Sequence, residues 1–345
     1  MRRVEWNAGP RYTYDDKTAR EGTMRRGILS LSVLTLLLGA NPAFAQDHLK
    51  VAIGNRNVGE TFVTELGDKA GIFKKHGLAL DVFYTDGGGE TQQAVISNSA
   101  QIGVAVGFLG VLGVHAKGAP VRVIGSSFTG GTQMFWYVPA SSPIKTEKDL
   151  TGKTVAYSTN GASTHLAVLA LQKHTGVAFK PAATGNAAST YTQVMSGQID
   201  VGWAGAPFGV QALDEGKIRV IMKSSDPPEL NKQTVRLIIA NATELAQRRG
   251  VFVRFMRAYR ETLDWLYTSP DALHAYSAYS NMSEGAVKRA LQEFLPRDAL
   301  DPDRLSAVDS VMADAVSFRY LPAPLTKAQL DELIQIPERK PQASQ

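Results

Sequence analysis

Small and hydroxyl-bearing side chains dominate the segment STNGASTH, Ser158 to His165, between the strand-like run KTVAY and the helix-like run HLAVLALQKH. Residues of this kind often cap a helix by satisfying its first backbone N–H groups. The same N–H groups, at the positive end of the helix dipole, can instead bind an anion. Capping and anion binding therefore both remain open for this segment. Its candidate ligand-binding residues are Ser158, Asn160, Ser163 and Thr164.

Three earlier junctions, GNRNVG, TDGGGET and VGFLG, also lie where a strand-like run meets a helix-like run. In open α/β sheets, ligands bind beyond the carboxyl ends of the strands, so we expect these junctions to face one site. Each has a plainer interpretation: an exposed turn for Arg56, a flexible turn for the glycines and core packing for Phe108. The candidate ligand-binding residues are Asn55, Arg56, Asn57, Gly88, Gly89, Glu90 and Phe108.

Residue types that would support covalent or metal chemistry are scarce. The chain has no cysteine, and its six histidines are scattered without an HExxH spacing. His165 and His174 are nine positions apart, which does not bring them together on one helix face. A serine hydrolase would need a GxSxG elbow, which is also missing. We therefore expect no catalytic residue, no metal and no cofactor.

The N-terminal region has the three successive parts of a secretory signal peptide. From Met24, two arginines precede an apolar stretch, Ile28 to Leu38, and Ala43-Phe44-Ala45 forms a small-x-small cleavage signature. The apolar stretch is too short for a stable membrane span. We predict an upstream extension plus signal peptide over residues 1–45, with the signal over 24–45 and cleavage after Ala45, and hence a periplasmic protein. Translation of residues 1–23, and the Sec or Tat route, stay open.

Charge argues against a nucleic-acid partner. The first 45 residues hold seven of the 37 Lys and Arg and four of the 32 Asp and Glu, which leaves 30 basic and 28 acidic residues. A nearly neutral mature chain lacks the concentrated basic surface that nucleic-acid binding requires.

Short apolar runs alternate with amphipathic segments from HLKVAIG onward, which is typical of an α/β fold with largely parallel sheets. The pattern restarts after Thr132, and beyond Glu244 almost only helices are expected. Two arrangements are compatible with this pattern: two domains in series, or one domain interrupted by another, with VRLIIA returning to the first sheet. We favour the second arrangement: lobe 1 over 46–130 and 236–345, lobe 2 over 131–235, and a ligand cleft between them.

Three further candidate ligand-binding residues follow from this arrangement. Thr129 lies at the first crossing between the lobes, and the other two lie in the run IDVGWAGAP, where an aromatic side chain could stack on a ligand. Core packing is the alternative for that aromatic residue. The three candidates are Thr129, Trp203 and Pro207.

The segment SSPIKTEKDLTGKTVAYSTNGASTHLAVLAL resembles the middle part of the substrate-binding proteins of ABC importers for sulfonates, taurine, nitrate and thiamine-pyrimidine precursors. DKAGIFKKHGLALDV and SGQIDVGWAGAP resemble two other motifs of that family. The resemblance implies a two-lobed, type II-like periplasmic-binding-protein fold with two sheets, flanking helices and a helical C-terminal tail. It also implies a monomer that closes on a small anion and delivers it to an inner-membrane permease. Ala206 replaces an acidic residue frequent in the family, which argues against a zwitterion such as taurine.

Two other functions are compatible with this fold. A soluble periplasmic sensor for a two-component system would differ only in its docking partner. An enzyme like the pyrimidine synthases is disfavoured, because those depend on a cysteine-rich motif and this chain has no cysteine. Whether the anion is a sulfonate, a carboxylate or a related group stays open.

Export gives the first testable prediction. Because the cleavage signature ends at Ala45, protein recovered from the periplasm should begin at Gln46. N-terminal sequencing of periplasmic material measures this directly. An intact end at Met1 or Met24 in that fraction would contradict the prediction.

Overall fold

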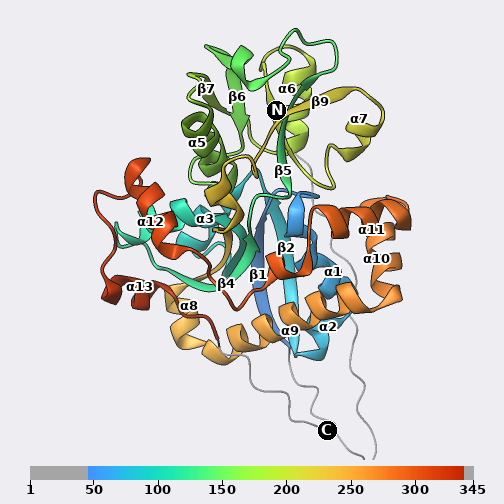
Figure 1. Cartoon of the computed structure of the whole chain (residues 1–345). Coiled ribbons are helices and arrows are strands. Elements are labelled where there is room, and N and C mark those ends of the chain that lie inside the picture. Colours follow the sequence, from blue (N-terminus) through green and yellow to red (C-terminus); the bar gives the residue numbers. More distant parts are fainter. Residues whose placement is uncertain (1–45, 338–345) are drawn as a thin grey trace, which may run out of the picture. The chain divides into compact units, whose positions relative to one another are not determined.

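The computed structural model describes residues 46–337 (Figure 1), all within one compact unit. The predicted extension and signal peptide lie outside the described residues, so their prediction stands untested. Across residues 46–337, none of the helices combines the length and the apolar character that a membrane crossing requires.

A five-stranded sheet in the order β2-β1-β3-β10-β4 organises the first half of the fold. Strand β1 pairs in parallel with both β2 and β3, whereas β10 runs antiparallel to β3 and β4. Every residue of β3 and β10 is buried, as expected for strands covered on both faces. The strands are β1 (Asp47–Gly54), β2 (Leu78–Thr85), β3 (Ile102–Gly107), β4 (Val121–Thr129) and β10 (Thr234–Asn241).

A second group of strands lies between β4 and β10 in the sequence. Strand β5 pairs antiparallel with β8 and β9, β6 pairs in parallel with β7, and an isolated bridge between Val155 and Val201 links the two sets. The strands are β5 (Met134–Pro139), β6 (Thr154–Tyr157), β7 (Lys180–Ala183), β8 (Gly202–Gly205) and β9 (Ile218–Lys223).

The chain crosses twice between the first sheet and the second group of strands, and the crossing segments lie side by side. Gly130 N–H donates to the Gln233 carbonyl at 2.9 Å, and the hydroxyls of Thr129 and Thr234 are 2.9 Å apart. Strand β10 contains the VRLIIA run and lies in the first sheet, between β3 and β4. The lobe boundaries at residues 130 and 235 stay a prediction.

The expectation of largely parallel sheets is wrong for the strands that follow the crossings. Strands β5 and β10 each begin directly after a crossing and run antiparallel to the neighbours in their own sheet. A strand that directly follows a crossing begins at the edge of its sheet that faces the other half. Since the parallel strands of the first sheet end at that edge, an arriving strand must run in the opposite direction.

Helices flank the strands of both halves (Figure 1). Beyond β10, the described residues form helices and short 3-10 turns. The long amphipathic helix α9 buries Phe252, Phe255 and Tyr259 and ends before Pro270, as the sequence predicts. The helices are α1 (Val63–Lys69), α2 (Ile72–Lys75), α3 (Gly88–Ile96), α4 (Phe108–His115), α5 (Ser163–Thr175), α6 (Ala187–Met195), α7 (Val210–Asp214), α8 (Ala242–Gln247), α9 (Arg249–Thr268), α10 (Pro270–Ser280), α11 (Glu284–Glu293), α12 (Val308–Ser317) and α13 (Lys327–Leu333). The 3-10 turns are η1 (Gly59–Phe62), η2 (Glu147–Leu150), η3 (Pro228–Asn231) and η4 (Arg297–Leu300).

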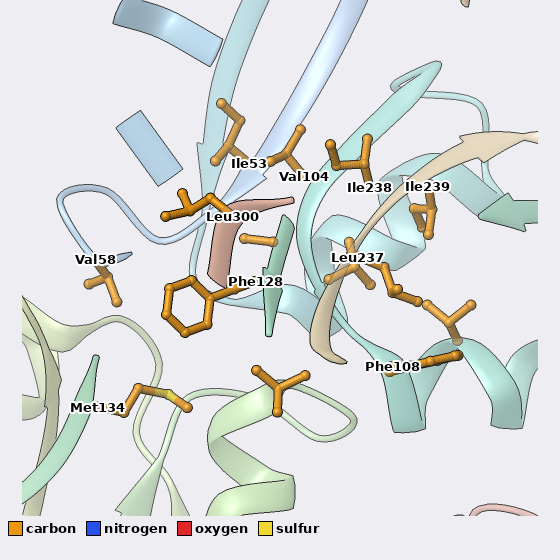
Figure 2. Close-up of a cluster of buried hydrophobic side chains, with 14 of the residues drawn as sticks. Ile53, Val58, Val104, Phe108, Phe128, Met134, Leu237, Ile238, Ile239 and Leu300 are labelled. Carbon is orange, nitrogen blue, oxygen red and sulfur yellow. The ribbon is translucent and has the colours of Figure 1, made fainter. Parts of the chain in front are cut away.

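Apolar side chains from β1, β3, β4 and β10 form the core of the first half. Figure 2 shows Ile53, Val104 and Ile238 gathered with Phe128 and Leu300, and the aromatic ring of Phe128 is fully buried. Leu300 belongs to η4, so the C-terminal part of the chain completes the core of a sheet built mainly from its N-terminal part.

The segment after α12 also holds the start of α5. Tyr320 OH accepts a hydrogen bond from Gly161 N–H at 2.9 Å and lies 2.6 Å from His165 Nδ1. The His165 ring stacks on Tyr157, with ring centroids 4.2 Å apart. Burial lowers the pKa of His165 from its ordinary value of 6.5 to about 4, so the imidazole is neutral at pH 7.

This neutral histidine predicts a pH-dependent stability. Because the folded-state pKa lies below the unfolded one, the unfolded chain binds a proton that the folded chain rejects. His165 therefore has no effect on the free energy of unfolding above about pH 6.5. Between about pH 6.5 and pH 4 it lowers this free energy progressively, and below about pH 4 its effect is constant. Urea unfolding of wild type and His165→Gln between pH 4 and pH 7 should show the weaker pH dependence in the variant. His174→Gln, which removes an exposed imidazole from the same helix, is the control, and equal slopes for wild type and His165→Gln would contradict the prediction.

Candidate ligand-binding site

The STNGASTH segment joins β6 to α5, as predicted, but its hydroxyls do not cap the helix. The N-cap residue of α5 is Ala162, whose side chain has no oxygen to accept a hydrogen bond. Thr164 Oγ1 instead accepts from Ser158 N–H at 3.0 Å and lies 2.8 Å from Ser158 Oγ. Asn160 Oδ1 accepts from the Tyr157 hydroxyl at 2.7 Å. Three of the four candidate residues therefore hold the loop in shape.

Ser163 has a different partner, the guanidinium of Arg236 on β10. Arg236 Nε donates to Ser163 Oγ at 2.8 Å, and Arg236 Nη1 donates to Glu60 Oε2 at 2.9 Å and to Gln133 Oε1 at 3.0 Å. The side chains of Arg236 and Glu60 are 4% and 0% exposed. Ser127 Oγ donates to the other carboxylate oxygen at 2.9 Å. The hydrogen bond from Arg236 to Ser163 thus joins the start of α5, in the second half, to a buried ion pair of the first half.

Several donors around this guanidinium lack a strong acceptor. Arg236 Nη2 faces the sulfur of Met134 at 3.3 Å, and a thioether is only a weak acceptor. Within residues 46–337, Gln133 Nε2 is buried without a hydrogen-bond partner. The Ser163 hydroxyl accepts from Arg236 and still has its own proton to donate. We call Glu60, Gln133, Met134, Ser163 and Arg236 the central cluster.

These donors suit an oxyanion. Guanidinium, amide and hydroxyl groups in a buried site make short, charge-assisted hydrogen bonds to carboxylate or sulfonate oxygens. The N-terminus of α5, a helix of 13 residues, adds favourable dipole potential at Ser163. The Glu60 carboxylate balances the charge of the guanidinium.

The structure brings the predicted glycine junctions against the STNGASTH segment. Gly89 N–H donates to Thr159 Oγ1 at 3.0 Å. A Cβ atom on Gly107 would lie 2.1 Å from the Gly161 carbonyl oxygen, so only glycine permits this approach. The loops after β2, β3 and β6 therefore meet at one place, as predicted from their positions at strand ends.

The other candidates in the TDGGGET junction serve the fold locally. Gly88 lies against the backbone of β3, where an added Cβ would be 3.0 Å from the Ala105 carbonyl oxygen. Glu90 is exposed and accepts from Asp86 N–H at 3.0 Å. Both residues therefore shape the start of α3 rather than the central cluster.

The GNRNVG junction forms a short backbone connection to the second half. Phe208 N–H donates to the Asn57 carbonyl at 3.3 Å, Gly59 N–H donates to the Ala206 carbonyl at 2.7 Å, and Val58 forms a β-bridge with Pro207. We call residues 57–59 with 206–208 the strap. Two predicted residues, Asn57 and Pro207, thus lie in this one connection.

The remaining two residues of that junction lie outside the strap. Asn55 is 7% exposed, and its Oδ1 is buried without a hydrogen-bond partner in the described part of the chain. Arg56 is more than half exposed, pairs with Glu65 at 3.4 Å and lies over the ring of Tyr84. The exposed-turn interpretation describes Arg56 better than a place in the central cluster.

Three other candidates have structural roles in the fold. Phe108 and Trp203 are fully buried in the hydrophobic core, so the core interpretation describes both. Thr129 bonds the crossing strand through Thr234. Large aromatic side chains in apolar runs are packed more often than they are ligand contacts.

The sequence did not point to four of the five residues of the central cluster: Glu60, Gln133, Met134 and Arg236. Arg236 did leave a signal, because it is the one charged residue in the apolar run VRLIIA. A charge in a run that must be buried on both faces requires a buried partner. Glu60 and Gln133 carried no comparable local signal.

The chain matches the family model described as NMT1/THI5 like over residues 65–273, more than half of its length. No curated protein sequence matches it. The alkanesulfonate-binding protein SsuA from Xanthomonas axonopodis pv. citri, bound to MOPS, is similar in structure, with 16% identity, a TM-score of 0.71, and coverage of 85% of this chain and 100% of that chain. The periplasmic aliphatic sulphonate binding protein SsuA from Escherichia coli is also similar, with 18% identity, a TM-score of 0.62, and coverage of 84% and 97%.

The desulfurization enzyme DSZB shares the fold as well, at 16% identity and a TM-score of 0.58, with coverage of 84% of this chain and 97% of that chain. At these identities the structural likeness establishes the fold alone. The family match confirms the resemblance that the sequence motifs predicted. The chain therefore belongs to the NMT1/THI5-like family and has the two-lobed α/β fold of periplasmic binding proteins.

Proposed function

We propose that the protein is the solute-binding component of an ABC importer and captures a small organic anion at the central cluster. The observation that carries this proposal is the buried Arg236, with donors from both halves around it and, among residues 46–337, only a thioether facing Nη2. The names of the two SsuA structures, which describe alkanesulfonate and aliphatic sulphonate binding, support an anionic ligand.

The arrangement couples binding to closure. Arg236 belongs to the first sheet, Ser163 to the start of α5 in the second half, and Gln133 to a crossing segment. An anion that accepts from all three interacts best when the halves are together, so it favours the closed arrangement. Separation of the halves would expose the cluster and admit the ligand.

The setting of this activity is part of the proposal. We infer a periplasmic, monomeric protein that hands its ligand to an inner-membrane permease. Support comes from the sequence before Gln46, which resembles a signal peptide, and from the word periplasmic in the name of the Escherichia coli structure.

Ser163 and Thr164 give a matched pair of variants for the anion site. A thermal-shift panel of alkanesulfonates, carboxylates and nitrate first selects the anion that most raises the melting temperature. Ser163→Ala should then lower the affinity for that anion by about ten- to hundredfold, because a hydroxyl that donates to a charged group is worth about 1.5–3 kcal/mol. Calorimetric titration measures this affinity.

Thr164→Ala is the control, since its hydroxyl bonds Ser158 within the loop. It should lower the free energy of unfolding by about 1 kcal/mol and leave the affinity nearly unchanged. Unchanged affinity in Ser163→Ala would remove the central cluster as the anion site.

The protein should also bind this anion without converting it. The fold leaves the matter open, since a desulfurization enzyme shares it, but the chain lacks cysteine and the motifs of hydrolytic or metal catalysis. Mature protein incubated with the selected anion should return it unchanged by mass spectrometry. Turnover that survives repurification and falls in Ser163→Ala would establish an enzyme instead.

A further inference from the structure

A cavity of about 430 Å³ lies beside the strap, away from the central cluster. Its lining comes from both halves of the fold: Asn57 and the turn between α10 and α11 on one side, and residues of α6, the strap and the α7 region on the other. No residue of the central cluster lines it. We call this cavity the rim pocket.

The walls of the rim pocket are apolar and only partly covered. Tyr191, Phe208 and Met282 line it, and each is half-buried at the margin of a hydrophobic cluster. Two aromatic side chains and a flexible thioether form a surface that suits a flat apolar ring. Partly exposed apolar side chains that gather in a concave site from two directions are typical of a small-molecule pocket.

The polar edge of the pocket carries no net charge. Lys217 Nζ lies 2.6 Å from Glu215 Oε2. The carboxylate raises the pKa of the Lys217 amine and compensates its charge. Asn57 and Asn281 also line the cavity and offer neutral hydrogen-bonding groups. The pocket therefore favours a neutral molecule, whereas the central cluster offers buried hydrogen-bond donors to an oxyanion.

Contacts beside the pocket join the two halves. Arg289 on α11 pairs with Asp214 on α7 at 3.0 Å. The strap forms a second connection between the halves. An occupant of the pocket touches both halves and so stabilises their closed arrangement. Its volume falls in the range of small-molecule sites and accommodates a molecule of one or two rings.

We propose that the rim pocket is a second binding site, for a neutral aromatic molecule, and that it is distinct from the anion site. The test uses indole as the probe and isothermal titration of the mature protein. Indole should bind saturably to wild type. Met282→Glu and Tyr191→Ser, on opposite sides of the pocket, should each weaken indole binding by about tenfold or more, since both remove apolar contact area.

Two control variants distinguish the rim pocket from the central cluster and from a general effect of added charge. Met195→Glu places the same charge at an exposed methionine that does not line the pocket, and it should leave indole affinity unchanged. Ser163→Ala alters the anion site and removes one hydrogen bond between the halves, so it should weaken indole binding less than either wall variant does. Melting curves by circular dichroism show which variants are folded, and either wall variant alone suffices for the comparison.

The proposal fails if wild type does not bind indole saturably, or if the folded wall variants keep full affinity. It fails equally if Ser163→Ala weakens indole as strongly as the wall variants do, because the probe would then occupy the central cluster. Loss of indole binding in the wall variants alone, with anion affinity retained, supports a separate site.

Discussion

The buried ion pair between Arg236 and Glu60 is the interaction on which the rest of the site depends. Both side chains are removed from solvent, at 4% and 0% exposure, and the loss of hydration costs several kcal/mol per ion. Ser127 donates to the carboxylate, and the guanidinium donates to Ser163 and Gln133, which offsets part of this cost. These bonds fix η1, β4, β10 and the start of α5 relative to one another.

The path of the chain explains why Arg236 lies at this point. Strand β10 enters the first sheet directly after the second crossing, so its first residues lie at the edge that faces the second half. Arg236 is in register with Gly107 of β3. Because Gly107 has no side chain, the Gly161 backbone approaches it closely and brings the start of α5 to the guanidinium. A single glycine thus permits the contact that joins the two halves.

The strap divides the region between the halves into two chemical environments. On one side, the central cluster offers the hydrogen-bond donors of a buried guanidinium, a hydroxyl and an amide. On the other, the rim pocket offers aromatic rings, a thioether and an ion pair without net charge. Backbone hydrogen bonds between residues 57–59 and 206–208 form this division.

The sequence by itself determined the features that depend on near neighbours. Apolar runs and their turns predicted the α/β class, the proline at 270 predicted the end of α9, and the hydroxyl-rich segment predicted the strand-to-helix junction before α5. Tertiary structure alone decided what the hydroxyls do, since Thr164 bonds a residue six positions away and Ser163 one that is 73 positions away. It also paired Glu60 with Arg236 across 176 positions, and it buried Phe108 and Trp203 rather than leaving them to a ligand. Local patterns reflect periodic burial and backbone geometry, whereas the partner of a buried polar group is chosen by whichever distant segment the fold brings within hydrogen-bonding distance.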